Sequence, residues 1–260
     1  NRQRGGVDKT KRIKTMEQHQ NKGRPFRQRR RPRKKPQETE EFISPLDFLD
    51  LESDGDQPSA VQQDTARHHQ GIFIIGTDTG VGKTVAVCAL GALLKQRGLQ
   101  AGVMKPIDCG AEDMKVFQDA CHAGTFSSAG CVYSFREKIS PYFAFKKNHA
   151  VFDMEKTVQV CRQAVEENDV TLIEGPGGLC DPLTEKQTVA DLIKALGLKV
   201  VVAAPLRRGT LNHLAMLAGQ ARACGVEIQG VLLTETQRSI PKAYFLAKIQ
   251  AVREVAGLAV

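Results

Sequence analysis

The sequence lacks any apolar run that approaches the roughly 20 residues needed to span a bilayer, and it has no secretory signal pattern. Its seven cysteines are scattered, and no two form the close C-x-x-C pair that a zinc site or a disulfide framework would use. We therefore expect a cytoplasmic protein whose cysteines are reduced and mostly buried as small apolar side chains. The chain begins with Asn rather than Met, and we expect a fragment or a processed product.

Charge is distributed unevenly along the chain. Residues 1–37 carry 15 Lys and Arg side chains against two acidic ones, whereas residues 38–70 carry nine acidic side chains against one Arg. Residues 71–260 hold 21 basic and 18 acidic side chains, so the excess positive charge belongs to the first segment. Neither charged segment offers enough apolar surface to offset chain entropy. We therefore predict a disordered tail over residues 1–70, basic in 1–37 and acidic in 38–70.

The basic segment permits two interpretations. It is either a solvated linker or a nucleic-acid-binding arm, because runs of Arg and Lys attract phosphate backbones. No aromatic side chain interrupts residues 27–36, which argues against a platform for base stacking. Any nucleic acid is expected to bind through this tail alone.

From Gly71 onward, short apolar runs alternate with helical patterns. We predict strands near 71–75, 101–104, 170–173, 200–204 and 228–233, and helices near 83–97, 153–168, 188–196, 210–224 and 241–255. Strands that alternate with helices form a mostly parallel sheet with helices on both faces, so residues 71–260 are predicted to be a single α/β domain. Ligands of such sheets bind beyond the carboxyl ends of the strands, which is where the motifs below fall.

A glycine-rich loop follows the first predicted strand and opens a helix. It consists of Gly76, Thr77, Asp78, Thr79, Gly80, Val81, Gly82, Lys83 and Thr84. Glycines let backbone N–H groups approach phosphate oxygens, and the helix N-terminus adds a positive dipole. In a P-loop the Lys reaches the outer phosphates and the hydroxyl binds Mg²⁺. The usual G-x-x-x-x-G-K-[ST] pattern would place its first Gly at position 77, where this chain has Thr; the strand–turn–helix context still favours a phosphate site over a ligand-free glycine turn.

The form G-T-D-T-x-V-G-K-T resembles the loop of the dethiobiotin synthetase family, and further matches follow in the family's order. Residues 105–106 match its K-P motif, and residues 174–178 read E-G-P-G-G against its E-G-A-G-G. Residues 182–191 resemble its P-L…T-x-A-D stretch, and residues 209–213 match G-x-x-N-H. The resemblance covers residues 72–255. It implies a P-loop NTPase-type fold, ATP and Mg²⁺ as cofactors, and a homodimer.

The resemblance also implies roles for individual residues. The expected catalytic residues are Lys83 and Lys105, whose charges face the transferred phosphate. The nucleotide would be held by the loop of residues 76–84 together with Glu174, Gly177 and Gly178. The expected ligands of Mg²⁺ are Thr84, Asp113 and Glu174, although an Asp at the start of a helix is equally common as a cap. The expected substrate contacts are Lys105, Cys109 and Asn212.

Four features depart from the family pattern. Cys109 stands where the family has Ser or Thr, and Pro176 replaces an Ala and removes a backbone donor. Thr234 stands where the family has an Asn that reads adenine, which leaves the preferred nucleotide base open. The family continues beyond Val260 with a strand and a loop, so we expect a truncated C-terminus.

The implied reaction is the ATP-dependent carboxylation and ring closure of 7,8-diaminopelargonate with CO₂ to dethiobiotin, a step of biotin biosynthesis, through a carbamate and a carbamic–phosphoric anhydride.

Three alternative functions compete with this one. A related amidase ligase would append a glutaminase domain, for which 260 residues leave no room. A P-loop ATPase switch that partitions DNA would carry an extra Lys early in its loop, and residues 77–79 contain none. A degenerate relative would bind nucleotide without turnover, as the departures at 109, 176 and 234 would allow.

Overall fold

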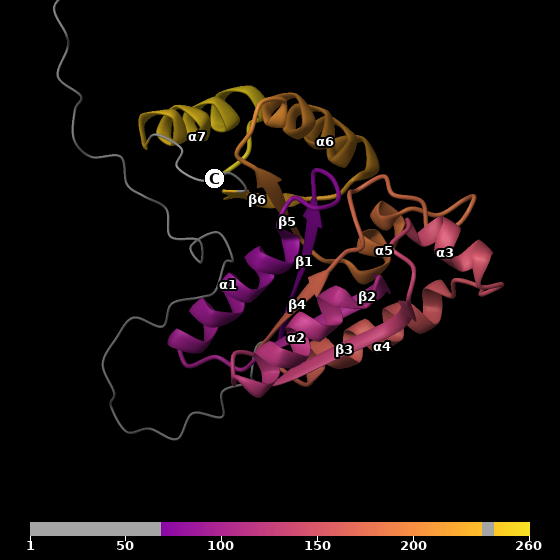
Figure 1. The fold of residues 1–260 in the computed structure, drawn as a ribbon. Helices are drawn as coiled ribbons and strands as arrows, with labels where there is room; N and C mark the ends of the chain where they lie inside the picture. The colour runs from indigo at the N-terminus through magenta and orange to yellow at the C-terminus, as the bar shows by residue number, and fades with distance from the viewer. Residues whose placement is uncertain (1–68, 236–241) are drawn as a thin grey trace, which may run out of the picture. The chain divides into compact units, whose positions relative to one another are not determined.

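The computed structural model describes residues 69–235 and 242–260 (Figure 1). The predicted tail lies outside the described residues except for His69 and Gln70, and Gln70 already begins the first strand. The backbone N–H of Gln70 donates to the carbonyl of Asp169 at 3.0 Å, and His69 Nδ1 lies 2.7 Å from the carbonyl oxygen of Asn168. Among the helices of the described residues, none combines the length and apolar character that a bilayer crossing requires.

Strands and helices alternate along the described residues. The strands are β1 (Gln70–Gly76), β2 (Ala101–Cys109), β3 (Ser128–Phe135), β4 (Val170–Glu174), β5 (Val200–Pro205) and β6 (Ile228–Thr234). The helices are α1 (Lys83–Gln96), α2 (Glu112–His122), α3 (Pro141–Lys147), α4 (Met154–Glu166), α5 (Val189–Leu196), α6 (Thr210–Cys224) and α7 (Lys242–Ala256). Every predicted strand and helix is present. Strand β3 and helices α2 and α3 were not predicted from the sequence.

The six strands form one sheet in the order β3-β2-β4-β1-β5-β6, and every pair of neighbours is parallel. The predicted parallel α/β fold is therefore confirmed. Strand β1 lies in the interior of the sheet between β4 and β5, so the loop that follows β1 has a strand end on either side. This topology brings the carboxyl ends of β1, β2 and β4 to one edge of the sheet.

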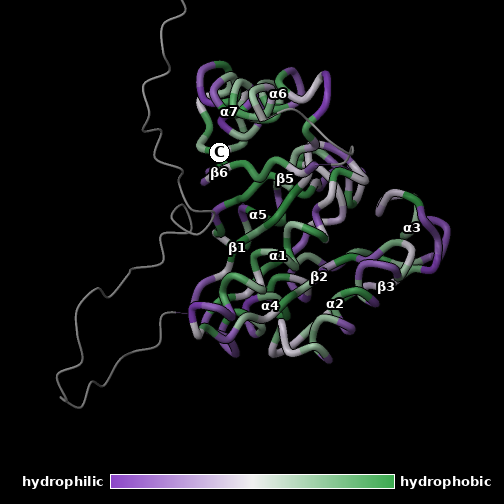
Figure 2. Tube along the Cα trace, turned by 60° about the vertical axis from the view of Figure 1, so that its left-hand side comes forward, coloured by the Kyte–Doolittle hydropathy of each residue, from purple (hydrophilic) through white to green (hydrophobic). Residues whose placement is uncertain are grey.

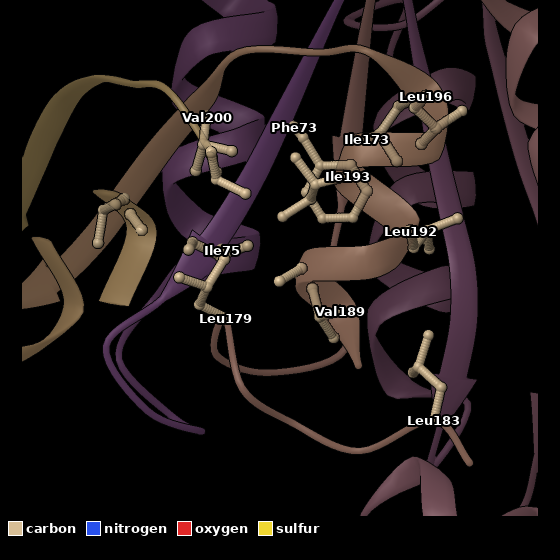
Figure 3. Close-up of a cluster of buried hydrophobic side chains, with 14 of the residues drawn as sticks. Phe73, Ile75, Ile173, Leu179, Leu183, Val189, Leu192, Ile193, Leu196 and Val200 are labelled. Atoms are coloured by element: carbon tan, nitrogen blue, oxygen red, sulfur yellow. The ribbon is translucent and has the colours of Figure 1, made fainter. Parts of the chain in front are cut away.

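Both faces of the sheet are buried because alternate residues of β1 point to opposite sides. Ile72 and Ile74 pack with apolar residues of α1 and α2, whereas Phe73 and Ile75 belong to the cluster that includes residues of α4 to α7. Figure 2 shows the hydrophobic colouring along the strands. Figure 3 shows how Ile193 and other apolar residues of α5 lie against β1 and β4. The core thus fixes the strand ends that carry the site.

All seven cysteines lie within the described residues and are free. Only Cys161 is buried, Cys180 is exposed, and the other five are partly covered. The prediction that the cysteines are mostly buried is therefore wrong. The partly covered ones include Cys131 on β3, which is an edge strand whose residues are mostly only partly buried.

Candidate active site

The glycine-rich loop turns sharply at the end of β1. A Cβ added at Gly76 would lie only 2.5 Å from the carbonyl oxygen of Asp78 and 2.7 Å from a methyl carbon of Val81, so no larger residue fits there without movement. Gly80 and Gly82 have φ angles of 66° and 90°, in the left-handed region that disfavours other residues. The glycines of the motif are thus required by the backbone path of the loop itself.

Helix α1 begins at Lys83 directly after this loop. Its N-terminus has no side-chain cap and no acidic residue in the first turn. The first N–H groups of a helix have no partner within the helix, and the dipole adds positive potential, so this end of α1 suits an anion. Lys83 is 7% exposed, and its Nζ donates to the carbonyl of Asp78 at 3.2 Å. Burial lowers the pKa of Lys83, and the charge of the neighbouring Lys105 lowers it further.

A buried ion-pair cluster lies beside the loop. Lys105 on β2 and Glu174 at the end of β4 are 2% and 0% exposed, and Lys105 Nζ lies 2.5 Å from Glu174 Oε1. Asp113, in the first turn of α2, accepts a second bond from Lys105 Nζ at 2.7 Å. The two strands are neighbours in the sheet, which brings these side chains together. One lysine therefore faces two carboxylates.

Burial and charge act against one another in this cluster. Burial opposes the charged form of Lys105, but Glu174 and Asp113 outweigh burial and raise its pKa. Burial also opposes ionisation of Asp113, yet Lys105 lowers the pKa of that carboxyl below its ordinary value. Burial raises the pKa of Glu174, because this carboxyl has no access to water. An additional cation would favour the ionised form of Glu174.

The cluster offers oxygen atoms that fit Mg²⁺. Thr84 Oγ1 lies 2.9 Å from Asp113 Oδ1 and 3.3 Å from Glu174 Oε1. Glu174 Oε2 is buried and has no hydrogen-bond partner among the described residues. No group of three or more His, Cys, Asp or Glu side chains in the described part of the chain could hold a metal by itself. Mg²⁺ usually binds one or two carboxylates together with water and substrate phosphates, so this arrangement suits a metal that arrives with a nucleotide.

The loop and the cluster line one cavity of about 680 Å³. Residues 138–141 form its rim, where Lys138 pairs with Glu112 at 2.5 Å on the exposed surface. Cys109 also lines the cavity, and burial, followed by the nearby Asp108, raises the pKa of its thiol to about 11. Cys109 therefore remains a neutral thiol near pH 7, as the Ser or Thr it replaces would remain a neutral hydroxyl.

A smaller cavity of about 290 Å³ lies between the start of the loop, residues 178–181 and α6. Thr77 Oγ1 and His213 Nδ1, on residues that line it, are buried without a hydrogen-bond partner among the described residues. Asp181 lines both cavities. Its Oδ2 accepts the backbone N–H of Gly178 at 2.7 Å.

The structure gathers many of the predicted site residues around the main cavity, but not all. The residues that line it are Thr79, Gly80, Gly82, Lys83, Thr84, Lys105, Cys109, Asp113 and Glu174. Those that line the smaller cavity are Gly76, Thr77, Asp78 and Gly178. Val81 is buried, Gly177 lies against the Asp181 carboxylate, and Asn212 lines neither cavity. Asn212 is exposed on α6, where its amide nitrogen lies 3.5 Å from Met216 Sδ.

Asp181 and the rim residues of the main cavity were not predicted from the sequence to belong to the site. Asp181 directly precedes the P-L pair at residues 182–183, and its acidic side chain beside a phosphate-binding motif was a signal that could have drawn attention to it. The rim, residues 138–141, carries no motif, and only the fold places it beside the P-loop.

Thr234, at the end of β6, lies against the P-loop. Its hydroxyl oxygen is 2.5 Å from the carbonyl oxygen of Val81 and 3.2 Å from that of Ala204. A hydroxyl has a single proton to donate. Because both neighbours are acceptors, that proton is directed to the protein backbone.

Comparison with known proteins gives consistent matches. The profile of a protein family described as an AAA domain matches residues 70–260. An ATP-dependent dethiobiotin synthetase of Anaeromyxobacter sp. strain Fw109-5 is 37% identical over 171 residues, which are 64% of this chain and 77% of the relative. The enzyme of the same name from Bacillus licheniformis is 33% identical, over 63% of this chain and 72% of the relative. That from Methanocaldococcus jannaschii is 28% identical, over 72% of this chain and 90% of the relative.

Proposed function

Because the chain belongs to the dethiobiotin synthetase family, we propose that it catalyses the ATP-dependent ring closure of 7,8-diaminopelargonate with CO₂ to dethiobiotin. The observation that carries this proposal is the meeting of Lys105, Asp113 and Glu174 beside the P-loop. These residues come from three separate elements, yet they surround one cavity that is large enough for a small substrate and a phosphate chain.

The reaction has three steps. One amine of the substrate attacks CO₂ and loses a proton, which gives a carbamate. A carbamate oxygen then attacks the γ-phosphorus of ATP, the bond to the bridging oxygen breaks, and ADP leaves. Finally the second amine attacks the carbonyl carbon of the resulting anhydride, phosphate leaves with the electron pair, and the nitrogen loses a proton as the ring closes.

The residues of the cavity suit phosphoryl transfer, which needs positioning and charge neutralisation more than covalent help. The amides of the loop and of the first turn of α1 would hold the β- and γ-phosphates. Lys83 would move from the Asp78 carbonyl to a phosphate oxygen, and Lys105 would orient the carbamate. Cys109 would donate its thiol proton to the substrate.

Thr84, Asp113 and Glu174 would hold Mg²⁺. When bound, this ion neutralises charge on the phosphates. Glu174 would use its unpartnered Oε2, while Asp113 and Thr84 would turn from one another toward the ion or its water ligands. Lys105 would keep the two carboxylates in place before the nucleotide binds.

We further propose that the chain tolerates different nucleotide bases. The proton of the Thr234 hydroxyl is directed to backbone carbonyls, whereas the Asn of the family has an amide with which to read adenine. ATP, GTP and CTP should therefore support turnover at similar rates. Thr234→Asn should favour ATP; a parent protein that strictly requires ATP would contradict this proposal.

We also propose a cytoplasmic homodimer. Asn212 lines neither cavity of its own chain, so its predicted contact with substrate requires a second copy. Met216, which is 67% exposed on the same helix, would lie in the contact. Light scattering gives the mass in solution, and a monomer at working concentration would contradict the proposal. Residues 1–68 would be dispensable for chemistry, and a protein that begins at His69 should keep its turnover.

The decisive experiment is an incubation with ATP, Mg²⁺, isotopically labelled bicarbonate and diaminopelargonate, followed by mass spectrometry. Labelled dethiobiotin is the expected product, and phosphate release should require both the diamine and bicarbonate. Stimulation of phosphate release by DNA alone would instead support the ATPase switch. No response to either would support a nucleotide-binding relative without ligase activity.

A further inference from the structure

The charged side chains of the main cavity can be matched to partners. Lys138 pairs with Glu112 at the rim, and Lys105 pairs with Asp113 and Glu174. The carboxylates of Asp113 and Glu174 outnumber Lys105, and the excess negative charge would be balanced by Mg²⁺. The charge of Lys83 would be balanced by the phosphates. Among the charged residues that line the cavity, this leaves the Asp181 carboxylate without an assigned counter-ion.

A carboxylate at this position is unexpected for a cavity that binds phosphate alone. Burial lowers the pKa of Lys83 overall, and the charge of Asp181 is near enough to oppose that shift, yet no ion pair joins the two within the described residues. A negative side chain near the transferred phosphate repels it unless a cation lies between them. The position therefore calls for a positively charged or N–H-donating group on the ligand.

The protein backbone holds the carboxylate in a fixed place. Oδ2 accepts the N–H of Gly178, and a Cβ added at Gly177 would lie 1.6 Å from that same oxygen, so a larger residue at 177 would displace the carboxylate. The backbone N–H of Asp181 also lies 3.3 Å from the carbonyl oxygen of Gly178, which closes a tight turn. Oδ1 has no hydrogen bond to any described residue, and the residue lines both cavities. The turn thus presents one free carboxylate oxygen at the wall between the cavities.

From this geometry we propose that Asp181 is a substrate-binding residue whose Oδ1 accepts a hydrogen bond from one amine of the diamine substrate. This inference rests on the proposed function. The contact holds the amine beside the P-loop and balances the charge of the carboxylate. A hydrogen bond to a charged group contributes more than a neutral one, so the contact selects a diamine over a monoamine.

The test compares Asp181→Asn with the parent. The amide oxygen of Asn can still accept the N–H of Gly178, so the turn is kept while the charge is removed. We expect the KM for diaminopelargonate to rise roughly tenfold or more, with the KM for ATP nearly unchanged. Asp119→Asn, the same change at an exposed position of α2, serves as the matched control and should leave both constants unchanged.

Two further measurements separate this inference from the proposed function. Calorimetric titration of diaminopelargonate, with Mg²⁺ and a non-hydrolysable ATP analogue present, reports binding without turnover and should show the same loss in Asp181→Asn. Two monoamine analogues of the substrate each lack one of its two amines. The effect of Asp181→Asn should disappear for the analogue that lacks the amine held by Asp181, and it should persist for the analogue that keeps that amine.

The outcomes are distinct. If the parent makes dethiobiotin and Asp181→Asn has an unchanged KM for the diamine, the inference is wrong and the proposed function stands. An equal rise in the KM for ATP would show that Asp181 only supports the turn. If the parent binds the diamine without converting it and the variant binds it more weakly, the inference stands and the ligase proposal fails. If the parent neither binds nor converts the diamine, both are overturned.

Discussion

Two ion pairs of equal length line the main cavity in opposite surroundings. Lys105 and Glu174 lie 2.5 Å apart and are 2% and 0% exposed, whereas Lys138 and Glu112 lie 2.5 Å apart at the rim and are 68% and 66% exposed. In water, ionic attraction is screened and side-chain entropy opposes it; in the interior, an unpaired charge has no solvent to replace its partner. The same contact is therefore structurally essential in one place and dispensable in the other.

The largest expected effect is that of Lys105→Ala, which leaves the Glu174 carboxylate buried without its cation. The free energy of unfolding should fall by about 3–5 kcal/mol, and turnover should be lost. Denaturant unfolding measures the first and phosphate release the second. The double variant Lys105→Ala, Glu174→Gln should regain part of the stability without activity. An equal loss in both variants would show that packing of the lysine stem, rather than charge, is responsible.

Lys83→Ala should affect chemistry and spare the fold. Lys83 donates only to the Asp78 carbonyl among the described residues, and burial already lowers its pKa, so its removal leaves no buried carboxylate unpaired. Loss of a cation at the phosphates should reduce turnover by a factor of roughly 10²–10³ or more. Cys88→Ala, on the same helix, is the control and should keep its activity. Similar turnover in Lys83→Ala and the parent would rule out the P-loop assignment.

Glu174→Gln and Asp113→Asn test the proposed Mg²⁺ site and the share that each carboxylate has in it. Both should raise the Mg²⁺ concentration needed for half-maximal turnover, and Glu174→Gln should raise it more, because the unpartnered Oε2 belongs to Glu174. A magnesium titration of each variant measures this. An unchanged titration in Asp113→Asn would show that Asp113 does not bind Mg²⁺. Its role would then be to stabilise the N-terminus of α2, where a negative charge is favourable.

The smallest effect is expected at the rim. Lys138→Ala removes a partner of Glu112, but Glu112 stays solvated at the start of α2, near the positive end of the helix. We expect no measurable change in Tm at either low or high salt. A clear drop in Tm that disappears at high salt would mean that the rim pair stabilises α2. The exposed pair would then contribute to stability, as the buried pair does.

Local patterns predicted most of the fold. The alternation of apolar runs with helical spacing identified β1, β2, β4 and β5, because these strands are largely buried and read as apolar segments. It also identified β6, whose Val231, Leu232 and Leu233 form an apolar run although most of the strand is only partly buried. The missed elements have weaker patterns. Phe117 is the sole buried residue of α2, and β3 is an edge strand with mostly intermediate exposure. Their position depends on the rest of the sheet rather than on their own sequence.

The sequence by itself determined the phosphate-binding loop and the chemical types of the residues around it, because the residues of the P-loop are contiguous and their glycines dictate the local path of the backbone. Tertiary structure alone decided which carboxylates meet Lys105, because Asp113 and Glu174 are far apart in the chain and meet only when β2 and β4 pair. It also decided the place of Asp181: a turn that folds its carboxylate onto the Gly178 N–H directs the residue to both cavities, and no spacing in the sequence encodes that direction.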